Sequence, residues 1–193
     1  MNIVTYPHPT LRYKSKSITK VDAELRKIVE EMFELMYEAQ GVGLAANQVD
    51  LPLRLFVCNP AGKKDEGEEF VFINPELSRP KGTDAMEEGC LSIPGVREEV
   101  IRPAAVHLEA YDMKGQSFNA NIDGFLAKIV QHENDHLNGV LFVDRVSETG
   151  KIAVDDALYE LELDFKNRVE TGLIPPEADI MDRLKEWEAK YCS

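Results

Sequence analysis

Two histidines four residues apart, with a glutamate directly after the first, are the clearest sign of chemistry in this sequence. They are His132, Glu133 and His136, in the segment Gln-His-Glu-Asn-Asp-His. In an α-helix, residues four apart lie on one face, so both imidazoles can bind one metal ion, and the carboxylate lies about 100° round the axis. The motif predicts a hydrolytic metal site, although a solvated helix with two incidental histidines gives the same pattern.

A catalytic metal site needs a third protein ligand and an open position, whereas structural sites are usually closed by four protein ligands. Several carboxylates and two cysteines could supply that ligand. Cys90 is a good candidate because Gly89 lets the backbone approach a neighbour closely and Leu91 can turn an amide toward the same place. By itself, a free cysteine is more often a small buried hydrophobic residue than a ligand, so the residues alone leave the ligand set open.

The elements that must position these groups follow from hydrophobic spacing and from runs of β-branched and aromatic residues. The order of elements predicts an α+β fold, with mainly antiparallel sheets packed around a central metal-binding helix and additional N- and C-terminal helices. The predicted helices are 22–40, 125–137, 157–165 and 180–191. The predicted strands include 53–58, 70–74, 106–111 and 117–122. Residues 61–69 are predicted to form an exposed loop.

Composition and charge limit the function classes. A chain of 193 residues fits one compact domain with or without an appendage. The net charge of −13 disfavours direct binding to nucleic acid or anionic lipid. No apolar stretch reaches the roughly 18 residues of a membrane span, and three widely spaced cysteines make a poor disulfide framework. We expect a cytoplasmic protein without a membrane role, although an organellar protein without its transit segment would look the same.

A glycine-rich segment at residues 41–46 also matches the pattern of a dinucleotide-binding loop, G-x-G-x-x-A. That loop must follow a strand and open a helix within a βαβ unit. Here the segment follows a predicted helix and continues into a segment that contains a proline. We therefore reject dinucleotide binding.

Three segments together closely resemble the motifs of the peptide deformylase family, in the family's order. Residues 41–48 match G-x-G-L-A-A-x-Q, residues 88–92 match E-G-C-L-S, and residues 131–136 match Q-H-E-x-D-H. The resemblance covers most of the chain, so we predict a catalytic domain over residues 1–165. A C-terminal extension with a helix is predicted over residues 166–193. That helix could pack on the domain, mediate a dimer or contact the ribosome.

The resemblance implies that Cys90, His132 and His136 bind one divalent metal ion, with water in the fourth position. It implies Fe2+, and Zn2+, Ni2+ or Co2+ could substitute because the same donors accept each of them. It further implies that Glu133 acts as general acid/base while the metal-bound water attacks a formyl carbon.

The remaining catalytic roles and the substrate follow from the same resemblance. The side-chain amide of Gln48 and the backbone N–H of Leu91 would stabilise the oxyanion. The substrate would be the N-terminal formyl-methionine of a newly synthesised polypeptide, and formate would be released. The implied substrate-binding residues are Val42, Gly43, Met86, Gly89, Arg97, Phe125 and Ile129. Core packing is the alternative reading for Met86, Phe125 and Ile129. A transient ribosome contact, and a monomer or a homodimer, are expected.

Several other charged residues receive structural predictions. Arg102 is expected to pair with Asp135 behind the metal helix. The alternative is an exposed ion pair, which would contribute little stability. His8 and His107 are not expected to be ligands, and His107 is expected to face solvent within a strand. Lys128 is expected to point away from the pocket, with its ammonium group in water.

Two other functions stay open at this point. A zinc peptidase uses the same His-Glu-x-x-His motif, but it would cleave internal amide bonds of unformylated peptides. A binding module stabilised by a structural metal would have a fourth protein ligand and would not depend on Glu133.

Overall fold

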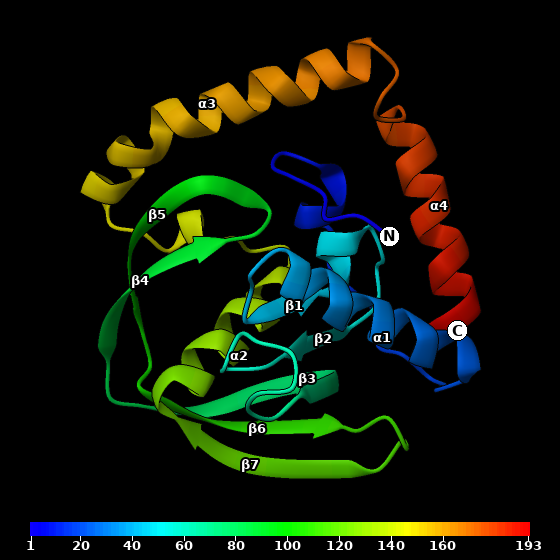
Figure 1. Cartoon of the computed structure of the whole chain (residues 1–193), viewed down its shortest axis with the longest axis vertical. Coiled ribbons are helices and arrows are strands. Elements are labelled where there is room, and N and C mark those ends of the chain that lie inside the picture. The colour runs from blue at the N-terminus through cyan, green and yellow to red at the C-terminus, as the bar shows by residue number, and fades with distance from the viewer.

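The structure, a computed structural model that describes residues 1–193, contains a five-stranded sheet and a separate two-stranded hairpin (Figure 1). The strands of the sheet, in spatial order, are Gly43–Ala45 (β1), Leu55–Cys58 (β2), Phe70–Lys81 (β3), Ala105–Tyr111 (β6) and Ser117–Asp123 (β7). The hairpin consists of Asp84–Cys90 (β4) and Ile93–Arg102 (β5). All neighbouring strands are antiparallel.

Four α-helices and three short 3-10 turns complete the chain. The helices are Ala23–Glu38 (α1), Gly124–Leu137 (α2), Glu148–Glu170 (α3) and Glu177–Tyr191 (α4). The 3-10 turns are Pro9–Arg12 (η1), Ala46–Val49 (η2) and Phe142–Asp144 (η3). The predicted α+β class with antiparallel sheets is confirmed. None of the helices is both long and apolar enough to cross a membrane.

Helix α2 packs against one face of the five-stranded sheet. Its buried residues Ile129, Val130 and Leu137 join a cluster with Phe56 and Phe72 of the sheet. Asp123 precedes the helix in an extended conformation, and apolar residues then recur at helical spacing. Because the residues at 129, 132, 133 and 136 share one face, the predicted catalytic groups border the apolar face that fixes the helix to the sheet.

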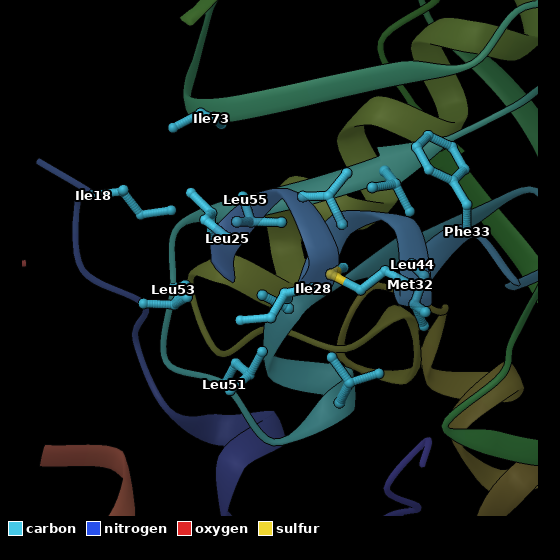
Figure 2. Packing of buried hydrophobic residues seen from close by; sticks show 14 of the residues in the cluster. Ile18, Leu25, Ile28, Met32, Phe33, Leu44, Leu51, Leu53, Leu55 and Ile73 are labelled. Carbon is cyan, nitrogen blue, oxygen red and sulfur yellow. The ribbon is translucent and has the colours of Figure 1, made fainter. Parts of the chain in front are cut away.

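Helix α1 builds the largest apolar cluster with strands β1 and β2 (Figure 2). Asp22 caps the helix by accepting a hydrogen bond from the Leu25 N–H at 2.9 Å. Met32 packs beside Leu44 of β1 in this cluster, so the core reaches the segment that carries Gln48. Burial of this cluster therefore holds one wall of the predicted site in place.

The C-terminal helices lie outside this core but are attached to it. Figure 1 shows α3 running along one side of the molecule and α4 returning toward α1. Helix α3 packs its first turns on β5, and Tyr191 at the end of α4 is fully buried in the α1 cluster. The helix predicted at 180–191 therefore packs on the domain. The predicted division at residue 165 falls inside α3 and stays a prediction.

The hairpin and one histidine differ from the sequence-based expectations. No separate strands are predicted at β4 and β5, because β4 contains three acidic residues and a glycine, which rarely favour strands. The prediction that His107 faces solvent is wrong, since its side chain is buried and its Nδ1 lies 2.9 Å from Asn121 Oδ1. His107 and Asn121 pair directly across β6 and β7. β6 is an inner strand between β3 and β7, so His107 has a cross-strand partner that the sequence alone does not show.

Gly139 is where the chain leaves α2 and passes directly against the N-terminal segment. Its φ is +73°, and a Cβ placed on it would lie 2.5 Å from the carbonyl oxygen of Arg12. Gly172, which follows α3, has a φ of +75° but no atom within 4 Å of such a Cβ. The two glycines therefore share the same backbone conformation and differ in the space around it.

We predict that Gly172→Ala lowers the free energy of unfolding by ~1–2 kcal/mol, because it introduces left-handed strain alone. Gly139→Ala should lower it by a further ~1–3 kcal/mol, because its methyl group also displaces the Arg12 backbone. Urea denaturation of both variants measures the difference. Equal losses would show that the close approach of these two segments is not part of the native structure.

Candidate metal centre and catalytic cleft

A cleft of about 690 Å³ lies between the β1–η2 segment, the β4–β5 hairpin and α2. Twelve of the thirteen predicted site residues line this cleft: Val42, Gly43, Gln48, Met86, Gly89, Cys90, Leu91, Arg97, Phe125, Ile129, His132 and Glu133. The thirteenth, His136, is buried, with 1% of its surface exposed. The fold thus brings together three segments that are far apart in the sequence.

Cys90, His132 and His136 form a cluster in which one donor atom of each residue lies within 4.8 Å of the others. Cys90 Sγ lies 3.2 Å from His136 Nε2. Cys90 stands at the end of β4, where the pairing with β5 shifts in register directly after Gly89. This irregularity turns the thiol toward α2.

The donor set fits a divalent transition metal. A thiolate and two neutral imidazoles are ligands that zinc, iron, cobalt and nickel accept. His132 Nδ1 lies 2.9 Å from Glu88 Oε2, which leaves the other ring nitrogen for the cluster, as is usual for metal-binding histidines. The cluster holds three protein side chains and no fourth, and it includes neither His8 nor His107. A site of this kind keeps an open position for a reacting group.

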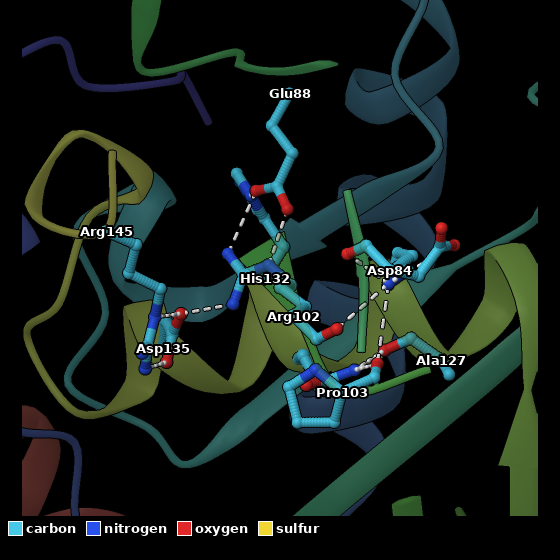
Figure 3. A network of polar contacts seen from close by, with 10 residues as sticks. Asp84, Glu88, Arg102, Pro103, Ala127, His132, Asp135 and Arg145 are labelled. Carbon is cyan, nitrogen blue, oxygen red and sulfur yellow. Dashed lines mark hydrogen bonds and ion pairs between the residues drawn. The ribbon is translucent and has the colours of Figure 1, made fainter. Parts of the chain in front are cut away.

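A buried network of charges holds the ligand-bearing elements together (Figure 3). Arg102 donates to Glu88 Oε2 at 2.9 Å and to Asp135 Oδ2 at 2.7 Å, which confirms the predicted Arg102–Asp135 pair. Arg145 also pairs with Asp135. The Arg102 and Asp135 side chains are only 3% and 9% exposed, so this pair is not the weak exposed ion pair weighed as the alternative.

The same network shifts the pKa of Glu88, beside the cluster, and of His132, within it. Burial alone would raise the pKa of Glu88, but hydrogen bonds and charges from Arg102 and His132 outweigh it and lower this pKa to about 2. Burial tends to lower the pKa of His132, yet contacts with Cys90 and Glu88 hold it well above its usual value. Glu88 is therefore a carboxylate that stays ionised and orients His132.

Glu133 is the second buried carboxylate, and its surroundings are different. Burial is the largest influence and raises its pKa to about 7, although the charges of His132 and Arg102 oppose this shift. Its Oε2 has no hydrogen-bond partner in the structure. Gly43 packs directly against this side chain, and a Cβ at Gly43 would overlap the carboxylate. The glycine is thus needed to leave space for Glu133.

Gln48 is held so that its amide group faces the cluster. Its Oε1 accepts a hydrogen bond from the backbone N–H of Ala45 at 2.8 Å. Its Nε2 lies 3.2 Å from Ser92 Oγ and 3.5 Å from Cys90 Sγ. Because the oxygen is occupied, the amide hydrogens are directed at Ser92 and Cys90. The backbone of Leu91 lies in the turn that directly follows Cys90.

The predicted substrate-binding residues combine buried and exposed positions. Ile129 is buried and belongs both to the cleft and to the core, whereas Phe125 is 47% exposed. Arg97 lies at the exposed rim, 3.6 Å from Glu87 across the hairpin. The prediction that Lys128 points into water is wrong, because its side chain is 3% exposed. Its Nζ donates to the carbonyl oxygens of Asp84 at 3.0 Å and Arg102 at 3.3 Å.

Glu88 has no predicted role, although it is the first residue of the recognised Glu-Gly-Cys segment. Residues two apart in a strand point to the same side. If a strand had been predicted over residues 84–90, it would therefore have placed Glu88 on the same side as Cys90. Nothing comparable in the sequence signals the hydrogen bond between Ala45 and Gln48, because it depends on the tight η2 turn.

Comparisons with known proteins identify the family. A family model described as polypeptide deformylase matches residues 1–151. A peptide deformylase of Rhodopirellula baltica is 50% identical over 191 residues, which cover 99% of this chain and 95% of that protein. A chloroplastic peptide deformylase 1B of Solanum lycopersicum is 41% identical, over 96% of this chain and 66% of that protein.

Solved structures show the same fold. The crystal structure of a plant peptide deformylase, PDF1B, has a TM-score of 0.87 and 39% identity, covering 92% of this chain and 95% of that one. A peptide deformylase from Plasmodium falciparum has a TM-score of 0.84 and 39% identity, covering 87% and 99%. The motifs, the fold and these relatives lead to one conclusion, that the chain is an enzyme that belongs to the peptide deformylase family.

Proposed function

We propose that this chain hydrolyses the formyl group from the N-terminal formyl-methionine of newly synthesised polypeptides and releases formate. The observation that carries the proposal is the cluster of Cys90, His132 and His136 next to the unpartnered carboxylate of Glu133, at the base of an open cleft. Three protein ligands with an open position and an adjacent acid/base group are typical of metal sites that catalyse hydrolysis.

Cys90, His132 and His136 would hold one divalent ion, which when bound supplies a Lewis acid that makes water more acidic and polarises the formyl carbonyl. We propose Fe2+ as the physiological ion. Zn2+, Ni2+ and Co2+ suit the same donors. Glu88 keeps the ring of His132 in orientation by accepting from its Nδ1–H.

Glu133 moves the proton of the reaction. Its free Oε2 takes a proton from the attacking water as the new carbon–oxygen bond forms. The carbon–nitrogen bond then breaks, and the carboxyl group returns a proton to the departing amine of methionine. The products are formate and a peptide with a free N-terminus, so atoms and charges balance.

Gln48 and Leu91 stabilise the charge that develops on the formyl oxygen. The amide hydrogens of Gln48 are directed at the cluster because Ala45 occupies the side-chain oxygen. The backbone N–H of Leu91 is the second donor in this proposal. Loss of one donor of this kind typically lowers the rate about 10²–10³-fold.

The peptide would bind in an extended form between two strand edges. β1 is the edge strand of the five-stranded sheet, and β4 pairs only with β5, so each has a free edge. Val42, Gly43 and Gly89 lie at these edges and line the cleft. The backbone of the peptide could add to them as a strand. The methionine side chain would contact Met86, Phe125 and Ile129, with Arg97 at the rim.

We also propose where and with which partners the reaction takes place. A cytoplasmic location, transient contact with the ribosome near the emerging peptide, and a monomeric or homodimeric state fit a function in protein biosynthesis. The relatives include bacterial and chloroplastic enzymes, so an organellar location fits the same chemistry.

A formate-release assay tests the proposal directly. The protein, loaded with Fe2+ under anaerobic conditions, should release formate from a formyl-methionyl tripeptide and leave internal bonds of unformylated peptides intact. Exposure to air should lower the activity as the iron is oxidised, and Ni2+ loading should resist this loss. Cleavage of internal bonds without formate release would instead identify a peptidase.

Glu133→Gln should reduce kcat in this assay about 10²–10⁴-fold, because the amide cannot accept the proton. The metal ligands are untouched, so the metal content of the variant should equal that of the parent protein, as measured by elemental analysis. A variant with normal turnover would rule out the assigned acid/base role. A variant without metal would show that Glu133 acts on binding instead.

Gly43→Ala should lower kcat about 100-fold, because its methyl group displaces the Glu133 carboxylate and a displacement near 1 Å has effects of this size. Metal content and the thermal midpoint should change little, since Glu133 is the side chain that must move. Steady-state kinetics with the same peptide measure the effect. Full activity in this variant would mean that the Gly43 contact does not position Glu133.

A further inference from the structure

The turn that carries Gln48 is too short to hold its own shape. η2 has four residues, Ala46–Val49, and Gln48 is the third of them. At its N-terminal end, the turn is closed by the bond between Ala45 N–H and Gln48 Oε1. At its C-terminal end, it depends on Asp50, whose N–H donates to the carbonyl oxygens of Ala46 and Asn47. The conformation of Asp50 therefore limits where Gln48 can lie.

Asp50 adopts a backbone conformation that needs support from its neighbours. Its φ is +67°, in the left-handed region that residues with a side chain rarely adopt. Such a residue costs about 1–3 kcal/mol and persists when surrounding contacts hold it. Two contacts do so here: Thr10 Oγ1 donates to Asp50 Oδ1 at 2.6 Å, and Arg183 pairs with Asp50 Oδ2.

Arg183 comes from α4, beyond the residues 1–151 that match the family model. Its side chain is 38% exposed and that of Asp50 is 20% exposed, so the pair is partly shielded from water. Such pairs are stronger than fully exposed ones. The C-terminal helix thus reaches the residue that closes the turn of Gln48.

The rest of α4 is anchored without Arg183. Ile180 and Leu184 are buried in a small apolar cluster, and Tyr191 is buried in the main core. The carbonyl oxygen of Tyr191 accepts from the N–H of Thr19 at 2.8 Å. Removing the Arg183 charge should therefore leave the helix docked, and its effect should be local to Asp50.

We propose that Arg183 is a positioning residue that, through Asp50, holds the η2 turn in the conformation that aims the amide of Gln48 at the reacting carbonyl. The inference rests on the proposed role of Gln48 as an oxyanion donor. It gives the C-terminal helix a part in catalysis without contact with the substrate. Because the oxyanion forms only in the transition state, the effect falls on kcat rather than KM.

The first test compares Arg183→Met with Lys185→Met in the formate-release assay. Lys185 lies on the same helix in an exposed pair with Asp182, with both side chains at least 66% exposed, and it contacts nothing near Gln48. We expect Arg183→Met to lower kcat about tenfold with KM nearly unchanged, and Lys185→Met to behave as the parent protein. Arg183→Lys should restore most of the loss, because Arg183 makes one contact with Asp50. Parental kcat in Arg183→Met would overturn the inference.

The second test separates positioning from general damage to the protein. In a Gln48→Ala background, Arg183→Met should change kcat less than about twofold, because the group that it positions is absent. The same tenfold loss in both backgrounds would show that Arg183 does not act through Gln48, and would overturn the inference. If Gln48→Ala alone keeps full kcat, the proposed oxyanion role fails, and the inference fails with it. If Gln48→Ala lowers kcat but Arg183→Met keeps the parental kcat, only the inference about Arg183 is overturned, and the oxyanion role of Gln48 stands.

Discussion

The charge of Arg102 is buried almost completely, and the elements around the cleft are arranged to satisfy it. An unpaired charge in such a position destabilises a protein by several kcal/mol. Arg102 ends β5, Glu88 lies in β4 and Asp135 lies in α2, so one guanidinium joins both strands of the hairpin to the helix. Cys90 follows Glu88 by two residues, and Glu88 also contacts His132. The geometry of the ligands thus depends on this buried ion network.

Two buried carboxylates near the cluster differ because of their partners. Glu88 is surrounded by Arg102 and His132, so its ionised form is stabilised, with a pKa of about 2. Glu133 lines the same cleft, its Oε2 has no hydrogen-bond partner, and burial raises its pKa to about 7. Environments that separate the pKa values of like residues also separate their functions. In the proposed mechanism, Glu88 orients the metal ligand His132, and Glu133 is left available to the substrate.

The sequence predicts the parts of the site that follow local rules, and it fails where tertiary contacts decide. The 3.6-residue period places His132, Glu133 and His136 on one face of α2, and the structure has them there. The β4–β5 hairpin is not predicted from the sequence, because the acidic residues of β4 disfavour a strand until it pairs with its neighbour. Lys128 can be buried because three backbone carbonyl oxygens accept hydrogen bonds from its ammonium group in place of water. No spacing rule reveals these carbonyls.

We propose above all that Cys90, His132 and His136 bind one metal ion and leave an open position. X-ray absorption spectroscopy at the metal edge of the iron- or cobalt-loaded protein measures this ligand set most directly. We expect one sulfur and two imidazole nitrogens, and we expect the sulfur to be lost in Cys90→Ser. A light atom should fill the remaining coordination, and added formate or hydroxamate should displace it. A spectrum without sulfur, with two sulfurs, or with a closed set of four protein ligands would contradict the proposal.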